Sequence, residues 1–196
     1  GMDAGVEIEN PHYDKILAGK EWYLNMGFYA GRIIAYVGLW ILMFFLMRRA
    51  SLQEDINPGI SNYKKQKVFS ALYLLVFGVT SSTGSWDLIM SVDPHWYSTL
   101  FGWYNFASYT VAMLSLSMLM ILHLKNRGYL QEVRADHLHD IGKFMFGFSV
   151  FWTYLWFSQF LLIWYGNVPE ETVYYAPRMD SLGFKIGFYA LFLINF

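Results

Sequence analysis

The sequence predicts an all-α, polytopic transmembrane helix bundle. Of the 196 residues, 56% are hydrophobic and only 15% are charged, which is less charge than a soluble domain of this size carries. The apolar residues also occur in long blocks, of the length that an α-helix needs to cross a bilayer. Such blocks are expected to be helical, because a helix satisfies all of its backbone hydrogen bonds within the segment.

We expect four full spans and the start of a fifth, packed as a single bundle over residues 1–196. The predicted spans are 24–47, 67–91, 100–124, 141–165 and 182–196. A polar segment precedes the first span and is expected to hold a short helix around residues 14–20. Because the fifth block stops before it is long enough to cross a bilayer, the sequence indicates a fragment of a longer chain.

The distribution of basic residues predicts the orientation of these spans. Basic side chains gather in two connections, and such connections stay on the cytoplasmic side of the membrane. The connections around His95 and Glu170 are poor in basic residues and are therefore expected to face outward. The residues of the two basic connections are Arg48, Arg49, Lys64, Lys65 and Lys67 in the first, and Lys125, Arg127 and Arg134 in the second.

A polar stripe on the second span ends in a carboxylate. On a helix, Thr80, Thr83, Asp87 and Ser91 would share one face, because residues three and four apart are neighbours. A carboxylate inside a span is costly and is often functional. The stripe therefore suggests a path for protons or substrate. The alternative is a helix-packing stripe whose Asp87 lies among the lipid headgroups.

Arg32, eight residues into the first span, is a candidate partner for Asp87. Both positions fall in the outer half of the membrane, and a lone buried charge becomes neutral or finds an opposite charge. An Arg32–Asp87 pair, direct or through water, is therefore one interpretation. In the other, Arg32 extends outward to the interface and Asp87 meets the headgroups separately.

The fourth span carries aromatic and amide side chains that could hold a quinone ring. Trp152, Trp156 and Gln159 share one helical face, and Tyr154 belongs to a second polar stripe. Aromatic rings can stack on a quinone and an amide can hydrogen-bond to its carbonyl oxygen. The alternative is that these side chains only pack the helix against its neighbours.

His137, His139 and Asp140 lie at the predicted cytoplasmic end of the fourth span. Histidines titrate near neutral pH, so together with carboxylates they could collect protons for a channel. In the alternative, Asp140 is the N-cap of the fourth span and the histidines are solvated. A metal site would lack a defined third protein ligand, so none is predicted.

The composition also limits the cofactors. The chain has no cysteine, which excludes disulfides, thiolate-ligated iron–sulfur clusters and covalently attached haem c within it. None of the five histidines falls in the middle of a predicted span, so a membrane-embedded haem b is not expected either. No basic patch interleaved with aromatic residues indicates nucleic-acid binding.

Several runs of sequence resemble a known family. They are residues 86–96, 98–104, 139–146, 151–160 and 163–171. They resemble the second of the NrfD-like (polysulfide-reductase-type) membrane subunits of bacterial alternative complex III, a quinol:cytochrome c oxidoreductase. The resemblance extends over nearly the whole chain from about residue 10, and the run in the fourth span is long and specific.

The resemblance implies a larger NrfD-like fold, of which this chain would be the central-to-later portion. It implies a multi-pass subunit of the bacterial cytoplasmic membrane that contributes to quinone binding, proton translocation or assembly, without catalytic activity on its own. His95 lies in a resembling run and joins the candidates for a quinone contact. The expected partners are a homologous NrfD-like subunit, cytochrome c-type and iron–sulfur subunits that carry the redox centres, other membrane and periplasmic subunits, and a terminal oxidase.

Two other functions remain open from the sequence. One is a purely structural subunit whose polar residues are buried against partners. The other is part of a secondary transporter, which would favour broken spans and charges at mid-membrane in inverted repeats. Neither of these features is visible in the sequence.

Overall fold

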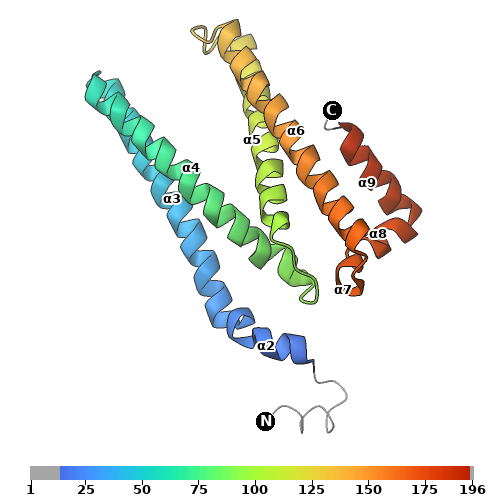
Figure 1. Cartoon of the computed structure of the whole chain (residues 1–196). Coiled ribbons are helices and arrows are strands. Elements are labelled where there is room, and N and C mark those ends of the chain that lie inside the picture. Colours follow the sequence, from blue (N-terminus) through green and yellow to red (C-terminus); the bar gives the residue numbers. More distant parts are fainter. Residues whose placement is uncertain (1–13, 195–196) are drawn as a thin grey trace. The chain divides into compact units, whose positions relative to one another are not determined.

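The computed structural model describes residues 14–194. These residues form helices joined by short connections, with no strand (Figure 1). The all-α prediction is therefore confirmed. Four helical segments are long enough and apolar enough to cross a membrane: Met26–Ile56, Ile60–Val92, Leu100–Asn126 and Ala135–Gly166. The elements are α2 (Lys15–Leu24), α3 (Met26–Ile56), α4 (Ile60–Leu88), the 3-10 helix η1 (Met90–Val92), α5 (Leu100–Asn126), α6 (Ala135–Gly166), α7 (Pro169–Thr172), α8 (Ala176–Asp180) and α9 (Leu182–Ile194).

The helices extend beyond the predicted spans where polar residues follow the apolar block. The helix α3 continues to Ile56 and α4 begins at Ile60, so most of the predicted basic connection is helical. Arg, Lys, Gln and Glu are good helix formers, and only the Asn57-Pro58-Gly59 turn interrupts them, because proline disfavours helical conformation before it. The short helix predicted near the start is confirmed as α2.

Residue contacts divide the chain into two compact units, each of which is described by itself. Among the described residues, the first unit holds residues 14–80 and Met90–His95, and the second holds Ser81–Ile89 and residues 96–194. The boundary falls inside α4, after Thr80. The prediction that the whole chain forms a single bundle stays a prediction.

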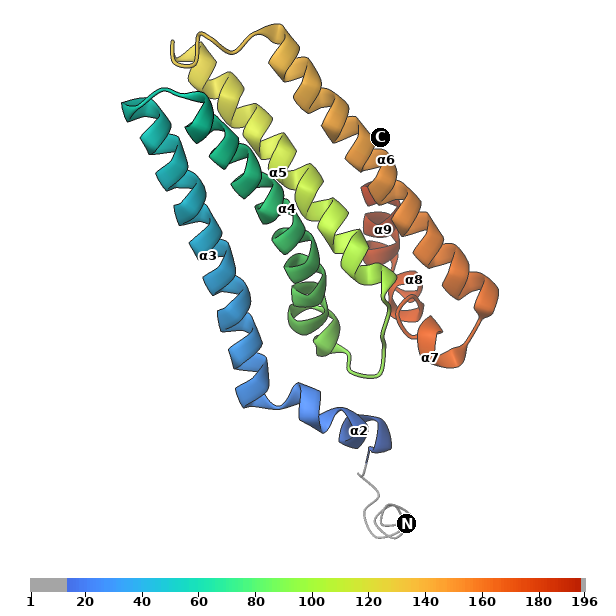
Figure 2. The same ribbon diagram turned by 60° about the vertical axis from the view of Figure 1, so that its left-hand side comes forward.

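In the first unit, α3 and α4 are held together by a hydrogen bond between side chains. Figure 2 shows the two helices side by side, joined by the short turn. The Trp40 indole N–H donates to the Thr80 hydroxyl oxygen at 2.8 Å, and the Thr80 hydroxyl donates to the Val76 carbonyl one turn earlier at 2.7 Å. The Trp40 ring also lies 5.9 Å from that of Phe77, measured between centroids.

In the second unit, α5 and α6 lie side by side (Figures 1 and 2). Ala107 of α5 is completely buried, and its small side chain lets α6 approach. The residues of the core are Ala107, Trp152, Leu155 and Trp156, and Leu100, Tyr104, Phe188 and Phe192 pack against them. The aromatic face predicted for the fourth span is therefore the buried face of α6.

The helices α5 and α6 both end at a residue with left-handed backbone. Gly128 has a φ of +87°. Its N–H donates to the Lys125 carbonyl and the Tyr129 N–H donates to the Leu124 carbonyl, which is the Schellman pattern that closes a helix. At the end of α6, Asn167 takes the same region with a φ of +46°.

At Gly102 the start of α5 closely approaches the last turns of α4 within the second unit. A Cβ atom built on Gly102 would lie 3.1 Å from the Ser82 Cβ and 3.1 Å from the Trp86 Nε1. Such distances are shorter than ordinary van der Waals contact, so this contact depends on the absence of a side chain. No sequence pattern indicates this role of Gly102.

Candidate functional site

A cavity in the second unit is the best-formed candidate site. It lies among α5, α6, α8, α9 and the turn before α8, and its volume is about 110 Å³. For comparison, an apolar cavity of roughly 150 Å³ takes up one benzene ring, so this cavity is somewhat smaller and encloses at most a single ring. Its lining residues are Phe101, Tyr104, Trp156, Gln159, Tyr174, Tyr175, Arg178, Phe188 and Leu191.

Aromatic rings form the walls of the cavity. Trp156 lies 4.6 Å from Phe188 of α9, and Tyr175 lies 5.7 Å from the same ring, each distance joining two ring centroids. Trp156 is itself part of the buried core of α5 and α6. These contacts fix the planes of the rings, and ligand sites of this kind combine apolar walls with a few placed polar groups.

Gln159 brings an amide to the cavity from α6. Its side chain is buried, with 9% of its surface exposed. The Ser98 hydroxyl donates to the Gln159 Oε1 at 2.8 Å, so the amide is held in one orientation. An amide also carries two N–H donors on its nitrogen, and these are the groups that could bind a ligand oxygen.

Arg178 brings a positive charge to the cavity from the short helix α8. Its guanidinium carbon lies 3.7 Å from the centroid of the Tyr174 ring, a cation–π contact. One guanidinium N–H donates to the Tyr174 backbone carbonyl. Among residues 14–194, no carboxylate forms an ion pair with Arg178.

Tyr174 and Tyr175 supply phenol groups from the turn before α8, outside the long helices. Burial raises the pKa of both phenols above the ordinary value, and the nearby Arg178 charge lowers the two pKa values by a smaller amount. Tyr174 is stacked on Trp96, with 4.2 Å between the ring centroids. Both phenols are therefore protonated at neutral pH and can donate hydrogen bonds.

The raised pKa values predict how stability depends on alkaline pH. The fold favours the protonated phenols, so their contribution is present below the unfolded pKa of about 10 and is lost as pH rises above it. We expect the melting temperature of Tyr175→Phe to fall less than that of the natural chain between neutral pH and pH values above about 10. Tyr165→Phe is the control, because Tyr165 is 85% exposed. An equal fall in all three proteins would contradict the prediction.

The structure brings two of the predicted quinone contacts to the cavity. Trp156 and Gln159 line it, and Trp152 is buried beside it, with its ring 5.3 Å from that of Tyr104 between centroids. Tyr154 is 63% exposed and does not line the cavity, because it lies on the opposite face of α6. Four further lining residues are not predicted by any sequence pattern: Tyr104, Tyr174, Tyr175 and Arg178.

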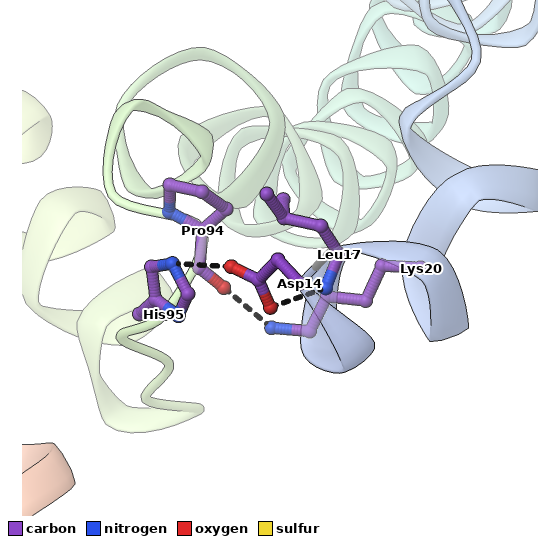
Figure 3. A network of polar contacts seen from close by, with 5 residues as sticks. All are labelled: Asp14, Leu17, Lys20, Pro94 and His95. Carbon is purple, nitrogen blue, oxygen red and sulfur yellow. Dashed lines mark hydrogen bonds and ion pairs between the residues drawn. The ribbon is translucent and has the colours of Figure 1, made fainter. Parts of the chain in front are cut away.

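His95, the remaining predicted quinone contact, belongs to the first unit, where it joins a polar network (Figure 3). Its Nε2 lies 2.9 Å from an Asp14 carboxylate oxygen. The Lys20 ammonium donates to the Pro94 carbonyl at 2.6 Å, and the other Asp14 oxygen accepts the Leu17 N–H at 3.2 Å. These bonds attach the start of α2 to the turn that follows η1. A quinone contact at His95 stays a prediction.

The predicted proton stripe is only partly formed by α4. Asp87 is 1% exposed in the second unit, Thr80 is buried in the first unit, and Thr83 is half-buried. The prediction that Ser91 continues this face is wrong, because α4 ends at Leu88 and Ser91 lies in η1. Such 3-10 turns are common at helix ends, and Pro94 disfavours helical backbone just before it.

Arg32 is held within the first unit by aromatic side chains and a carbonyl. Its guanidinium carbon lies 3.8 Å from the Tyr23 ring centroid and 4.5 Å from that of Phe28. One N–H donates to the Tyr23 carbonyl at 3.0 Å. Asp87 belongs to the second unit, and the Arg32–Asp87 pair stays a prediction.

The prediction that Asp140 caps the fourth span is wrong. The helix α6 already begins at Ala135, and Asp140 forms an exposed ion pair with Lys143 at 3.1 Å. Helix formation starts earlier because Asp136 places a negative charge in the first turn, and the His137 Nδ1 accepts the Arg134 N–H at 3.0 Å.

His137 and His139 are both exposed, and proton entry through them and Asp140 stays a prediction. Among the described residues, no group of three or more histidine, cysteine or carboxylate side chains lies close enough to hold a metal ion.

No protein-family model matches the sequence, and no curated protein matches it either. Two observations therefore bear on function: the resemblance of several sequence runs to NrfD-like subunits, and the geometry of the cavity.

Proposed function

We propose that this chain is an integral membrane subunit of a quinol:cytochrome c oxidoreductase complex of the bacterial cytoplasmic membrane. Its cavity would hold the ring of a quinone or quinol. The observation that carries the proposal is the cavity itself, in which Trp156 and Phe188 form aromatic walls and Gln159 presents an amide. Four helical segments of membrane-spanning length support a location in the bilayer, where quinones dissolve.

The residues of the cavity fit the chemistry of a quinone ring. A quinone is flat, apolar on its faces and carries two carbonyl oxygens, so it needs aromatic walls and hydrogen-bond donors at the ring edge. Gln159, Tyr175 and Arg178 are such donors. A bound quinol would supply electrons and protons, whereas the chain itself binds and orients the ring. The haem c and iron–sulfur centres belong in partner subunits, because the chain lacks cysteine.

The alternatives have less support. Secondary transporters commonly bind their substrates at discontinuous helices, whereas α3, α5 and α6 are continuous over their described lengths. A purely structural role would leave the donors of the cavity without a ligand. Proton translocation is a further role within the same complex, and the burial of Asp87 supports it.

Replacing Gln159 with leucine tests the proposed quinone contact. We expect Gln159→Leu to raise the KM for quinol about two- to tenfold in the assembled complex, because one neutral hydrogen bond contributes roughly 0.5–1.5 kcal/mol. The measurement is steady-state quinol oxidation in membranes. Tyr154→Phe is the matched control on the exposed face of α6 and should behave as the natural protein. Equal KM values in all three would contradict the proposal.

Cysteine labelling tests the predicted orientation. The chain has no cysteine of its own, so single cysteines introduced at exposed positions give no background. An impermeant thiol reagent applied to intact spheroplasts should label His95→Cys and Glu170→Cys but not Lys64→Cys or Arg134→Cys. The reverse pattern would show that the orientation is wrong and that Asp87 lies toward the cytoplasm.

A further inference from the structure

We propose that the cavity prefers ring ligands that carry an ionised oxygen, and that Arg178 confers this preference. The inference rests on the proposed function, since it specifies which rings the same cavity would take. Its ligand class is the enolate or phenolate of a hydroxylated quinone or a similar aromatic ring, rather than the neutral ring alone.

Arg178 lies at the cavity with its guanidinium held by Tyr174. The stacking on Tyr174 occupies one face of the guanidinium, and the bond to the Tyr174 carbonyl uses one N–H. A guanidinium has five N–H donors in its plane, so further donors remain at its edge. Arg178 also lines the cavity, and its contacts with Tyr174 hold the guanidinium in one orientation. A ligand in the cavity would therefore meet this cationic edge.

Arg178 brings its positive charge to a cavity with mostly aromatic walls. No described carboxylate pairs with Arg178, and the cavity walls around it are rings of Trp156, Tyr175 and Phe188. In surroundings of low polarity, a charge interacts more strongly with an opposite charge than it does in water. A ligand oxygen with a negative charge would therefore gain more from Arg178 than a neutral carbonyl oxygen.

The other polar groups of the cavity act in the same direction. Tyr174 and Tyr175 are protonated at neutral pH, so both can donate. The Gln159 Oε1 already accepts from the Ser98 hydroxyl, which leaves the amide nitrogen as the donor. A cavity rich in donors favours a ligand rich in acceptors, and an ionised oxygen accepts more strongly than a carbonyl. The small volume limits the enclosed part to about one ring.

The test compares two coloured probes of the same skeleton: lawsone, a hydroxynaphthoquinone that is ionised at neutral pH, and its neutral methyl ether. Their affinities are measured by equilibrium dialysis against the full chain in lipid nanodiscs, together with any subunits that co-purify. We expect lawsone to bind about tenfold more tightly, because a hydrogen bond to a charged group contributes roughly 1.5–3 kcal/mol against 0.5–1.5 for a neutral one.

Variants of Arg178 assign the preference to this residue. Arg178→Gln should weaken the binding of lawsone much more than that of the ether, so that the preference is lost, and Arg178→Lys should keep part of it because the charge remains. Arg134→Gln is the matched control, since Arg134 is exposed at the start of α6. In the natural chain, the preference should also disappear in acid that protonates lawsone, and this measurement does not depend on how well any variant folds.

The outcomes separate this inference from the proposed function. If the two probes bind equally well, and Gln159→Leu weakens the binding of both, the cavity still binds a ring. That result would overturn the preference for an ionised oxygen. A preference that survives Arg178→Gln would overturn the role of Arg178. If neither probe binds the natural chain, both the inference and the quinone site are wrong.

Discussion

Asp87→Leu is expected to reduce the yield of folded chain severalfold. Asp87 is 1% exposed, and buried polar groups in proteins are almost always held by hydrogen bonds or opposite charges. Removing the carboxylate leaves its buried neighbours without compensation, which costs on the order of 1–3 kcal/mol for a neutral group and more for a charged one. That is a large share of the roughly 5–15 kcal/mol that separates folded from unfolded protein. The measurement is the amount of monodisperse protein extracted from membranes.

Asp87→Asn then separates a structural role from a proton-transfer role. Asparagine keeps the shape of the side chain and can still hydrogen-bond, but it cannot carry a proton between groups. If Asp87 is a proton relay, the variant should assemble normally, and quinol oxidation or the coupled release of protons should fall. Asp55→Asn is the control, because Asp55 is exposed near the end of α3 and is not a candidate for the proton path. Normal assembly with normal turnover and proton release would contradict both roles.

The predicted Arg32–Asp87 pair has its own test. If the two charges compensate one another, Asp87→Asn should lower the yield of assembled protein, because Arg32 would lose its counter-charge. The double variant Arg32→Gln with Asp87→Asn should then restore part of that yield, since neither charge remains alone. A double variant whose loss equals the sum of the two single losses would contradict the pair.

The helices were predictable because their length and their continuous apolar surface are local properties of the sequence. The ends of the helices were less predictable. Arg48 and Arg49 mark the predicted edge of the membrane, but basic residues are good helix formers, so α3 continues to Ile56. Asp140 has the residue type of an N-cap, yet the helix was already started at Ala135 by a favourable first turn. The position where a helix starts depends on competing neighbours as well as on residue type.

The candidate site was predictable where its residues share a helical face. Trp156 and Gln159 are three residues apart on α6, so the sequence shows them together. Tyr174, Tyr175 and Arg178 lie in a segment without periodicity, and the turn between α7 and α8 brings them to the cavity. No local pattern indicates which way such a turn will fold. The role of Gly102 could not be predicted for the same reason. Whether a glycine permits a close contact depends on which residue lies next to it in space.

Gly102→Val is expected to destabilise the second unit by about 1–3 kcal/mol, the usual cost of overpacking a tight contact. The Cβ alone would lie 3.1 Å from both the Ser82 Cβ and the Trp86 Nε1, and 3.3 Å from the Ser82 carbonyl oxygen. The backbone oxygen cannot rotate away as a side chain can, so α4 and α5 would have to separate. Gly102→Ala should cost less, because it adds one methyl group and improves helix propensity.

Gly147→Val is the matched control for this prediction. Gly147 lies inside α6, and a Cβ built on it meets nothing within 4 Å. Gly147→Val changes helix propensity in the same way as Gly102→Val, but it adds no close contact. The difference between the two variants in unfolding by denaturant therefore isolates the steric effect. Equal stability of the two variants would mean that α4 and α5 do not meet at Gly102, and the close packing of the last turns of α4 on α5 would then be wrong.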